Sequence, residues 1–218
     1  MFKYKNKKIS QITEETLEEI KTTDIVKFED CFNQCIDILE SYTNITQLEF
    51  GGLFNMQILH FPPNLKYLDF CGTVFDQPLD NLPTGLEHLA IYSKFNQRLD
   101  NLPSTLKYLY LLGHNFNQSL DFLPIGLFHL QLGNCCHNIQ LDNLPNTIID
   151  FRFAGTPSVS LDMLPDSIEN LDIKDYKEKI NKLPKNLKRF KIHSTYQYLR
   201  NIRESCPDIK IETYFGYY

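Results

Sequence analysis

One phrase recurs along this chain and limits what it can fold into. FNQRLDNLP at residues 95–103 returns as FNQSLDFLP at residues 116–124. Prolines in the matching position follow one another at spacings of 19 to 21 residues: Pro62, Pro83, Pro103, Pro124, Pro145, Pro165 and Pro184. A period of this length is typical of solenoids of the leucine-rich-repeat kind, in which each coil covers the apolar face of its neighbour.

A strand-sized apolar rhythm follows each of these prolines. The phrases are LKYLDF at 65–70, LEHLAI at 86–91, LKYLYL at 106–111, LFHLQL at 127–132, IIDFRF at 148–153, IENLDI at 168–173 and LKRFKI at 187–192. Their last four positions alternate as in a half-buried strand, and the proline suits the bend before it. We therefore predict an α/β, leucine-rich-repeat-like right-handed solenoid of about ten parallel strands. Its parallel sheet forms the concave face, its return segments are irregular or short-helical, and helical caps close both ends.

The return segments carry further columns of repeated residues. Phe54, Phe75, Phe95 and Phe116 predict an aromatic spine, and Leu79, Leu99, Leu120 and Leu141 an aliphatic ladder. A column of acids could in principle hold a cation, but Asp at a turn more often accepts bonds from backbone N–H groups. We predict that structural role for Asp80, Asp100, Asp121, Asp142 and Asp162, and for the column Asn55, Asn96, Asn117 and Asn138.

We expect one domain, 1–218, in which residues 1–44 form an N-terminal cap with helices, 45–193 the repeats and 194–218 a C-terminal cap helix and strand. The pattern places strands at Ile25–Phe28 and Ile209–Tyr214 and a helix at Tyr196–Glu204, and makes Thr13 an N-cap. A further helix is expected to bury one face formed by Phe32, Cys35, Ile36 and Leu39.

Composition and charge narrow the classes of function. The net charge of -5 disfavours nucleic-acid binding, and no run approaches 18 apolar residues, so we expect no membrane association and a cytoplasmic protein. The six cysteines lack metal-ligand spacing and are expected to be reduced, mostly buried thiols. Histidines at equivalent positions, such as His88 and His129, are expected on the surface. No catalytic motif is present, so we predict no enzyme, no cofactor and no metal site.

FDQPLDNLPTGLEHLAI and FNQSLDFLPIGLFHLQL resemble the FNIP repeat, a relative of the leucine-rich repeat found in amoeboid eukaryotes and giant viruses. The resemblance covers roughly residues 50–193 and departs from the pattern at His137, Pro157 and Tyr176, which occupy the Phe position. It implies protein–protein interaction, as in F-box-bearing substrate receptors of ubiquitin ligases. The first 45 residues do not match an F-box.

A binding surface is predicted where the strand phrase faces outward. Its third and fifth positions, and the residue that follows it, point away from the core by alternation. Aromatic residues gather there mid-array, with acids on one side and basic groups on the other. The predicted partner site comprises Tyr67, Asp69, His88, Tyr92, Tyr108, Tyr110, His129 and Arg152.

The expected partner is a protein of unknown identity, with a host protein or a ubiquitin-ligase component as candidates, and the chain is expected to be a monomer. The alternatives are a homo-oligomeric structural module, an enzyme with an unrecognised site, or binding through the return segments that carry Arg98 and Asn117.

Overall fold

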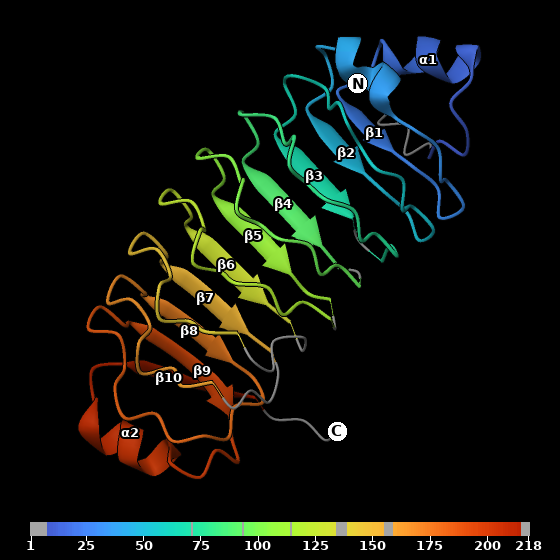
Figure 1. Cartoon of the computed structure of the whole chain (residues 1–218). Helices are drawn as coiled ribbons and strands as arrows, with labels where there is room; N and C mark the ends of the chain where they lie inside the picture. Colours follow the sequence, from blue (N-terminus) through green and yellow to red (C-terminus); the bar gives the residue numbers. More distant parts are fainter. Residues whose placement is uncertain are drawn as a thin grey trace, which may run out of the picture.

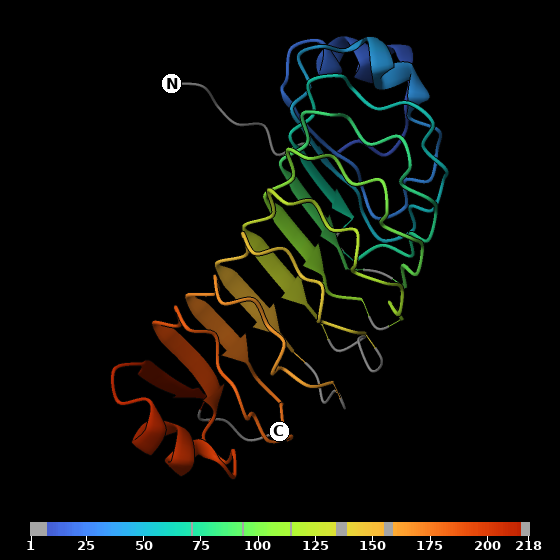
Figure 2. The same ribbon diagram turned by 60° about the vertical axis from the view of Figure 1, so that its left-hand side comes forward.

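A computed structural model describes residues 8–70, 72–92, 94–113, 115–133, 139–154 and 159–214 of the chain. Its strands stand in a single row, with the return segments running behind them (Figures 1 and 2). The elements are α1 (Glu14–Ile20), β1 (Ile25–Lys27), the 3-10 helix η1 (Asp37–Ser41), β2 (Gln47–Glu49), β3 (Tyr67–Phe70), β4 (His88–Ile91), β5 (Tyr108–Leu111), β6 (His129–Leu132), β7 (Asp150–Phe153), β8 (Asn170–Ile173), β9 (Arg189–His193), α2 (Leu199–Ser205) and β10 (Lys210–Tyr214). Helices α1 and α2 lie at opposite ends of the row (Figure 1).

Within the described residues, ten strands form one sheet in chain order, β1 to β10, and every neighbouring pair is parallel. Equivalent positions of successive strand phrases are direct partners, as in the run from Tyr67 through His88, Tyr108 and His129 to Asp150. The predicted parallel solenoid is therefore confirmed. The register places each outward residue beside its counterpart in the next coil, about 4.8 Å away.

The recurring proline forms the turn that leads into each strand. The backbone N–H of the residue three positions later donates to the proline carbonyl, for example from Leu86 to Pro83 and from Leu106 to Pro103, both at 3.0 Å. The same bond occurs in all seven repeats of the Pro-x-x-apolar phrase, at 3.0 to 3.2 Å. Because proline contributes only its carbonyl here, its missing N–H costs no hydrogen bond.

The core is a stack of side chains that point inward from every coil. Phe75 lies 6.2 Å from Phe95, and Phe95 lies 6.2 Å from Phe116, with ring planes within 5° of parallel. The four leucines of the predicted aliphatic ladder are buried as well, and Leu109 of β5 has no exposed surface. The predicted spine and ladder are both confirmed. This interior is continuous along the whole row of coils.

The asparagine column links each coil to the next through the backbone. The Asn55 Oδ1 accepts the N–H of Asp76, the Asp76 Oδ1 accepts that of Asn96, and the Asn96 Oδ1 accepts that of Asn117. These three bonds measure 2.9 to 3.0 Å. The predicted structural role is confirmed for this ladder, while Asn138 lies outside the described residues.

The acidic column also bonds to the following coil. The Asp162 carboxylate accepts the backbone N–H groups of Asn181 and Lys182, as the turn prediction required. Asp80 and Asp121 instead accept the side-chain amides of asparagines one coil later. Inter-coil asparagine bonds thus replace part of the predicted backbone bonding.

The N-terminal coil departs from the prediction in two ways. The helix expected around Phe32 is wrong: residues 32–36 are irregular, and only the short η1 follows them. Phe32 stacks on Phe28 at 4.0 Å, the same distance at which Phe54 stacks on Phe50, so this segment is a return segment. Cys31 and Cys35 are exposed, which contradicts the buried thiols expected there. Cys206 is half-buried, and Cys71, Cys135 and Cys136 lie outside the described residues.

The remaining terminal elements lie close to their predicted places. Thr13 caps α1, with Thr16 completing the capping box. Helix α2 begins at Leu199 instead of Tyr196, because Tyr196 is buried and its hydroxyl donates to the Glu178 carbonyl of the neighbouring coil. Strands β1 and β10 occupy the segments predicted for them.

Candidate functional site

A column of aromatic rings crosses the outer face of the sheet. Tyr67, His88, Tyr108 and His129 occupy the first residue of β3, β4, β5 and β6 and follow one another in register. Ring centroids are 5.7 Å apart for Tyr67 and His88, 4.2 Å for His88 and Tyr108, and 6.1 Å for Tyr108 and His129. We call these four residues the ring column. Each ring of the column thus has another ring of the column as its neighbour on the adjacent strand.

The other predicted residues lie around this column. Tyr110 stands beside it, with its ring 4.9 Å from that of His129. The Tyr67 hydroxyl donates to the Asp69 carboxylate at 3.2 Å. Tyr92 follows β4 and is 38% exposed, and Arg152 is exposed on β7. The structure therefore brings the predicted residues onto one face, as the register required.

His129 is the exception to the expected exposure. It is 6% exposed, and its Nδ1 lies 3.3 Å from the Asp150 Oδ1. The Nε2 atom is buried and has no hydrogen-bond partner within the described part of the chain. The prediction of a surface histidine is wrong here, because the Tyr110 ring and the Asp150 side chain of the two neighbouring strands enclose the imidazole. His129 is therefore the buried member of the ring column, and it offers little surface to a partner.

The positions next to the column also depart from simple alternation. Ala90 is buried at 4% exposure, although its position faces outward, since its small side chain lies between larger residues on β3 and β5. Gly51 and Gly133, expected to face outward, are buried. A Cβ at Gly51 would lie 2.6 Å from the backbone of Asp30, and one at Gly133 would lie 2.8 Å from Leu112. At these two glycines the backbone after the strand thus packs directly against the preceding coil.

Burial favours the uncharged forms of Tyr67 and His88 in the ring column. It raises the pKa of the Tyr67 hydroxyl, and the nearby Asp69 charge adds to that effect. Burial lowers the pKa of His88, so its imidazole is neutral at pH 7. Burial likewise raises the pKa of Tyr110.

Charged groups flank the column in pairs. Lys27 lies 2.7 Å from Glu49 on the N-terminal side, and Arg152 lies 3.0 Å from Asp150 on the C-terminal side. Burial would raise the pKa of Asp150, but hydrogen bonds from His129 and Arg152 and their charges hold it below its usual value. The resulting surface has an apolar aromatic centre and a polar margin, which is the arrangement of an interface core and rim.

The coils that carry the ring column match a known repeat family. The model of the FNIP repeat matches residues 54–94, 75–113 and 95–135. These coils are FNIP repeats. Every predicted partner-site residue except Arg152 lies within the FNIP coils. A comparison with curated proteins returned no match.

A solved structure is similar to this chain over more than the FNIP coils. It is described as CroV588, a circular LRR protein, and it is 26% identical to this chain with a TM-score of 0.57. The alignment covers 81% of this chain and 31% of that chain, so this chain spans about a third of the length of CroV588. The likeness establishes a leucine-rich-repeat-like parallel solenoid.

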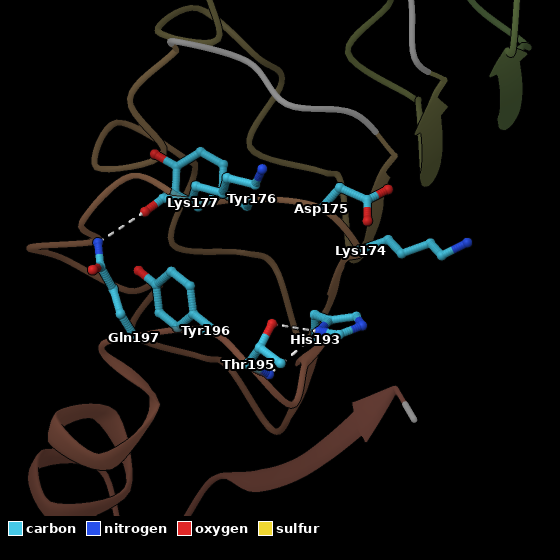
Figure 3. Close-up of a pocket in the computed structure, with 8 residues that line it drawn as sticks. All are labelled: Lys174, Asp175, Tyr176, Lys177, His193, Thr195, Tyr196 and Gln197. Atoms are coloured by element: carbon cyan, nitrogen blue, oxygen red, sulfur yellow. Dashed lines mark hydrogen bonds between the residues drawn. The ribbon is translucent and has the colours of Figure 1, made fainter. Parts of the chain in front are cut away.

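A small pocket beyond the FNIP coils was not predicted. It has a volume of about 250 Å³ and lies where β8 and β9 end, with Lys174, Lys177, His193 and Tyr196 among its lining residues (Figure 3). The His193 Nδ1 lies 2.8 Å from the Thr195 Oγ1, and the Tyr196 hydroxyl bonds to the Glu178 carbonyl. Tyr176 replaces the spine phenylalanine here, and that break in the repeat is the sequence signal for this hollow.

Two features are missing from the part of the chain that the structure describes. There, no group of three or more His, Cys, Asp or Glu side chains is arranged to hold a metal ion. None of the helices described is long and apolar enough to span a membrane.

Proposed function

We propose that this chain is a non-enzymatic scaffold that binds a partner protein through the outer face of its sheet. The observation that carries the proposal is the ring column, a continuous line of neighbouring aromatic rings on a sheet that is backed by a buried apolar core. Aromatic side chains that are already ordered lose little entropy on binding and offer large contact areas. The FNIP coils and the solenoid fold support a binding role.

The partner class and the place of the interaction are proposed from the family resemblance. The partner is a host protein or a ubiquitin-ligase component, bound as a substrate or as a decoy, and the interaction takes place in the cytoplasm. The sheet forms the concave side of a right-handed coil, and α1 and α2 act as caps of the array.

The test uses a variant that removes aromatic area without opening the core. Tyr92→Ala/Tyr108→Ala does this, whereas replacing Tyr110 would uncover the buried His129. A partner captured from host-cell lysate is identified and produced, and its affinity for each variant is measured by calorimetry. We expect a loss of at least tenfold, because centrally placed aromatic residues hold a disproportionate share of binding energy.

Arg98→Ala is the matched control. Arg98 lies in a return segment, is exposed and pairs only with Asp100 among the described residues, so its loss should leave affinity unchanged. If the double variant binds as wild type while Arg98→Ala weakens binding, the partner occupies the return-segment side and the proposal is wrong.

A further inference from the structure

A second column runs beside the ring column and has a different composition. It comprises the second residue of each strand phrase, just before the strand begins, and we call it the rim column: Lys66, Glu87, Lys107, Phe128, Ile149, Glu169 and Lys188. Charged residues occupy both ends of this column, and two apolar residues occupy its centre. Phe128 is 42% exposed and its ring lies 6.2 Å from that of Tyr108.

The coil that carries Phe128 exposes two further apolar side chains. Phe122 is 60% exposed, and Ile125 is 82% exposed in the turn after Pro124. The coils before and after hold Asn101 and Asn143 in place of Phe122, and Ser104 and Asn146 in place of Ile125. The repeat does not require apolar residues at these positions, because other coils fold with polar ones. Exposed apolar groups gathered outside the core indicate a contact surface.

The order of charges along the rim column indicates which surface is electrostatically complementary to it. Read outward from the midpoint between Phe128 and Ile149, one direction gives Phe128, Lys107 and Glu87, and the other gives Ile149, Glu169 and Lys188. Each basic residue on one side corresponds to an acidic residue on the other. A two-fold axis through this midpoint would place Lys107 opposite Glu169, and Glu87 opposite Lys188, of an identical column.

We propose that two copies of this chain associate through the rim column, with a two-fold axis between Phe128 and Ile149. Phe128 of each copy then packs on Ile149 of the other. Lys107 faces the other copy's Glu169, and Glu87 faces its Lys188. Since successive coils are about 4.8 Å apart, all six residues keep the same spacing in both copies.

The charges needed for this contact are available. Glu87 lies 2.8 Å from Lys107 and 3.6 Å from Lys66 within the chain, and Glu169 lies 2.7 Å from Lys188. The lysine side chains of these pairs are more than half exposed, and such surface pairs contribute little to stability. They can therefore reorient toward a second copy, or be shared with it, at small cost.

The contact between the two copies is narrow and buries little area, so we expect a weak dimer. Six coils span about 24 Å at 4.8 Å per coil. A strip of this length and one or two side chains wide buries less than the roughly 800 Å² per partner of a standard interface. We expect a dimer with a dissociation constant in the micromolar range or weaker, so that the monomer expected from the sequence is the dilute state. This inference does not depend on the proposed function.

Sedimentation equilibrium of the full chain, from about 1 to about 500 μM, measures the association. Wild type should shift from monomer to dimer over this range, and Phe128→Asp should abolish the shift. Leu53→Asp is the control, because Leu53 is 58% exposed but lies in a return segment after β2 and not in the rim column. A monomer throughout the range, or a dimer that Phe128→Asp leaves unchanged, overturns the proposal.

A charge exchange separates contacts between copies from contacts within one. Lys107→Glu and Glu169→Lys should each weaken the dimer at least tenfold, because each places like charges opposite one another twice per dimer. The double variant should restore the wild-type dissociation constant. Within one chain the double variant still leaves residue 107 beside Glu87 and residue 169 beside Lys188, so its melting temperature should not recover. A double variant that dimerises no better than either single variant contradicts the two-fold arrangement.

Discussion

The interior spine and the ring column are both rows of rings from successive coils, yet they differ in residue type and in how parallel their ring planes are. The spine repeats phenylalanine from Phe75 through Phe95 to Phe116, with planes within 5° of parallel. The ring column alternates tyrosine and histidine, and its neighbouring planes differ by 5° to 37°. The spine is enclosed on all sides, whereas the column has one open side. One repeat thus yields an interior that tolerates little change and a surface that can vary from coil to coil.

The largest effect should come from breaking the interior. Leu109→Ala removes a fully buried side chain from β5 and should lower the free energy of unfolding by about 2–5 kcal/mol, through lost burial and a residual cavity. Chemical denaturation measures this loss. Because each coil is held by its neighbours, hydrogen exchange should also accelerate in the adjacent strands β4 and β6. Acceleration confined to residues 106–111 would contradict this coupling.

A smaller loss should follow from breaking the asparagine ladder. Asn96→Ala removes the acceptor of the Asn117 N–H and of the Gln118 side-chain amide, and should cost about 1–1.5 kcal/mol in unfolding free energy. Exchange of the Asn117 amide proton should become faster. Among the described residues, the control Asn101→Ala removes one side-chain hydrogen bond, to Asp80, so the loss should be smaller. Equal losses in the two variants would mean that the backbone hydrogen bond to Asn96 contributes no more to stability than the side-chain hydrogen bond of Asn101.

The ring column should matter less to stability than either interior feature. Tyr108→Ala removes a half-buried ring that stacks on His88 and should cost roughly 0.5–1 kcal/mol. Thermal unfolding of this variant and of Leu109→Ala, side by side, compares the two faces at adjacent residues of one strand. A loss as large as that of Leu109→Ala would make the column part of the core and weaken its assignment as a binding surface.

The smallest effect should appear only as a change with pH. The lowered pKa of Asp150 means that its carboxylate stabilises the fold at pH values above the unfolded-state pKa of about 3.9. This contribution is lost as the pH falls through the lower folded-state pKa. Urea unfolding between about pH 5 and pH 2 should therefore be less pH-dependent in Asp150→Asn than in wild type. Asp208→Asn, at an exposed turn position, is the control.

The strands, register and core residues of the repeat coils could be predicted from the sequence. Their prolines, inward leucines and spine phenylalanines repeat at fixed intervals, and a parallel register follows directly from that repetition. The N-terminal coil could not be read this way. Phe32, Ile36 and Leu39 have helical spacing, yet no helix forms at Phe32. The Phe32 ring stacks on Phe28 and on Phe54 of the next coil, and Ile36 and Leu39 are buried in the same core. Tertiary packing overrode the local periodicity.

The candidate site shows where position alone is insufficient. Alternation correctly placed Tyr67, Tyr108 and Tyr110 on the outer face. It did not predict that His129 is buried, because that depends on the size of the side chains on β5 and β7 that enclose it. Likewise, the close approach of the backbone at Gly51 is set by the coil before it. How deeply a residue on this face is buried depends on the side chains and backbone of the neighbouring coils, which its position within one repeat does not specify.

The asparagine ladder has a consequence for how such a chain can change in length. Each rung joins residues one period apart, as Asn96 and Asn117 are separated by 21 positions. If residues 96–116 were lost together, Asn117 would follow Phe95 and could take the place of Asn96 opposite Asp76. No rung would be left open, and the spine would lose one ring without a gap. The ladder thus makes the whole coil the natural unit of duplication and deletion, and solenoids of different copy number can arise without redesign of any single contact.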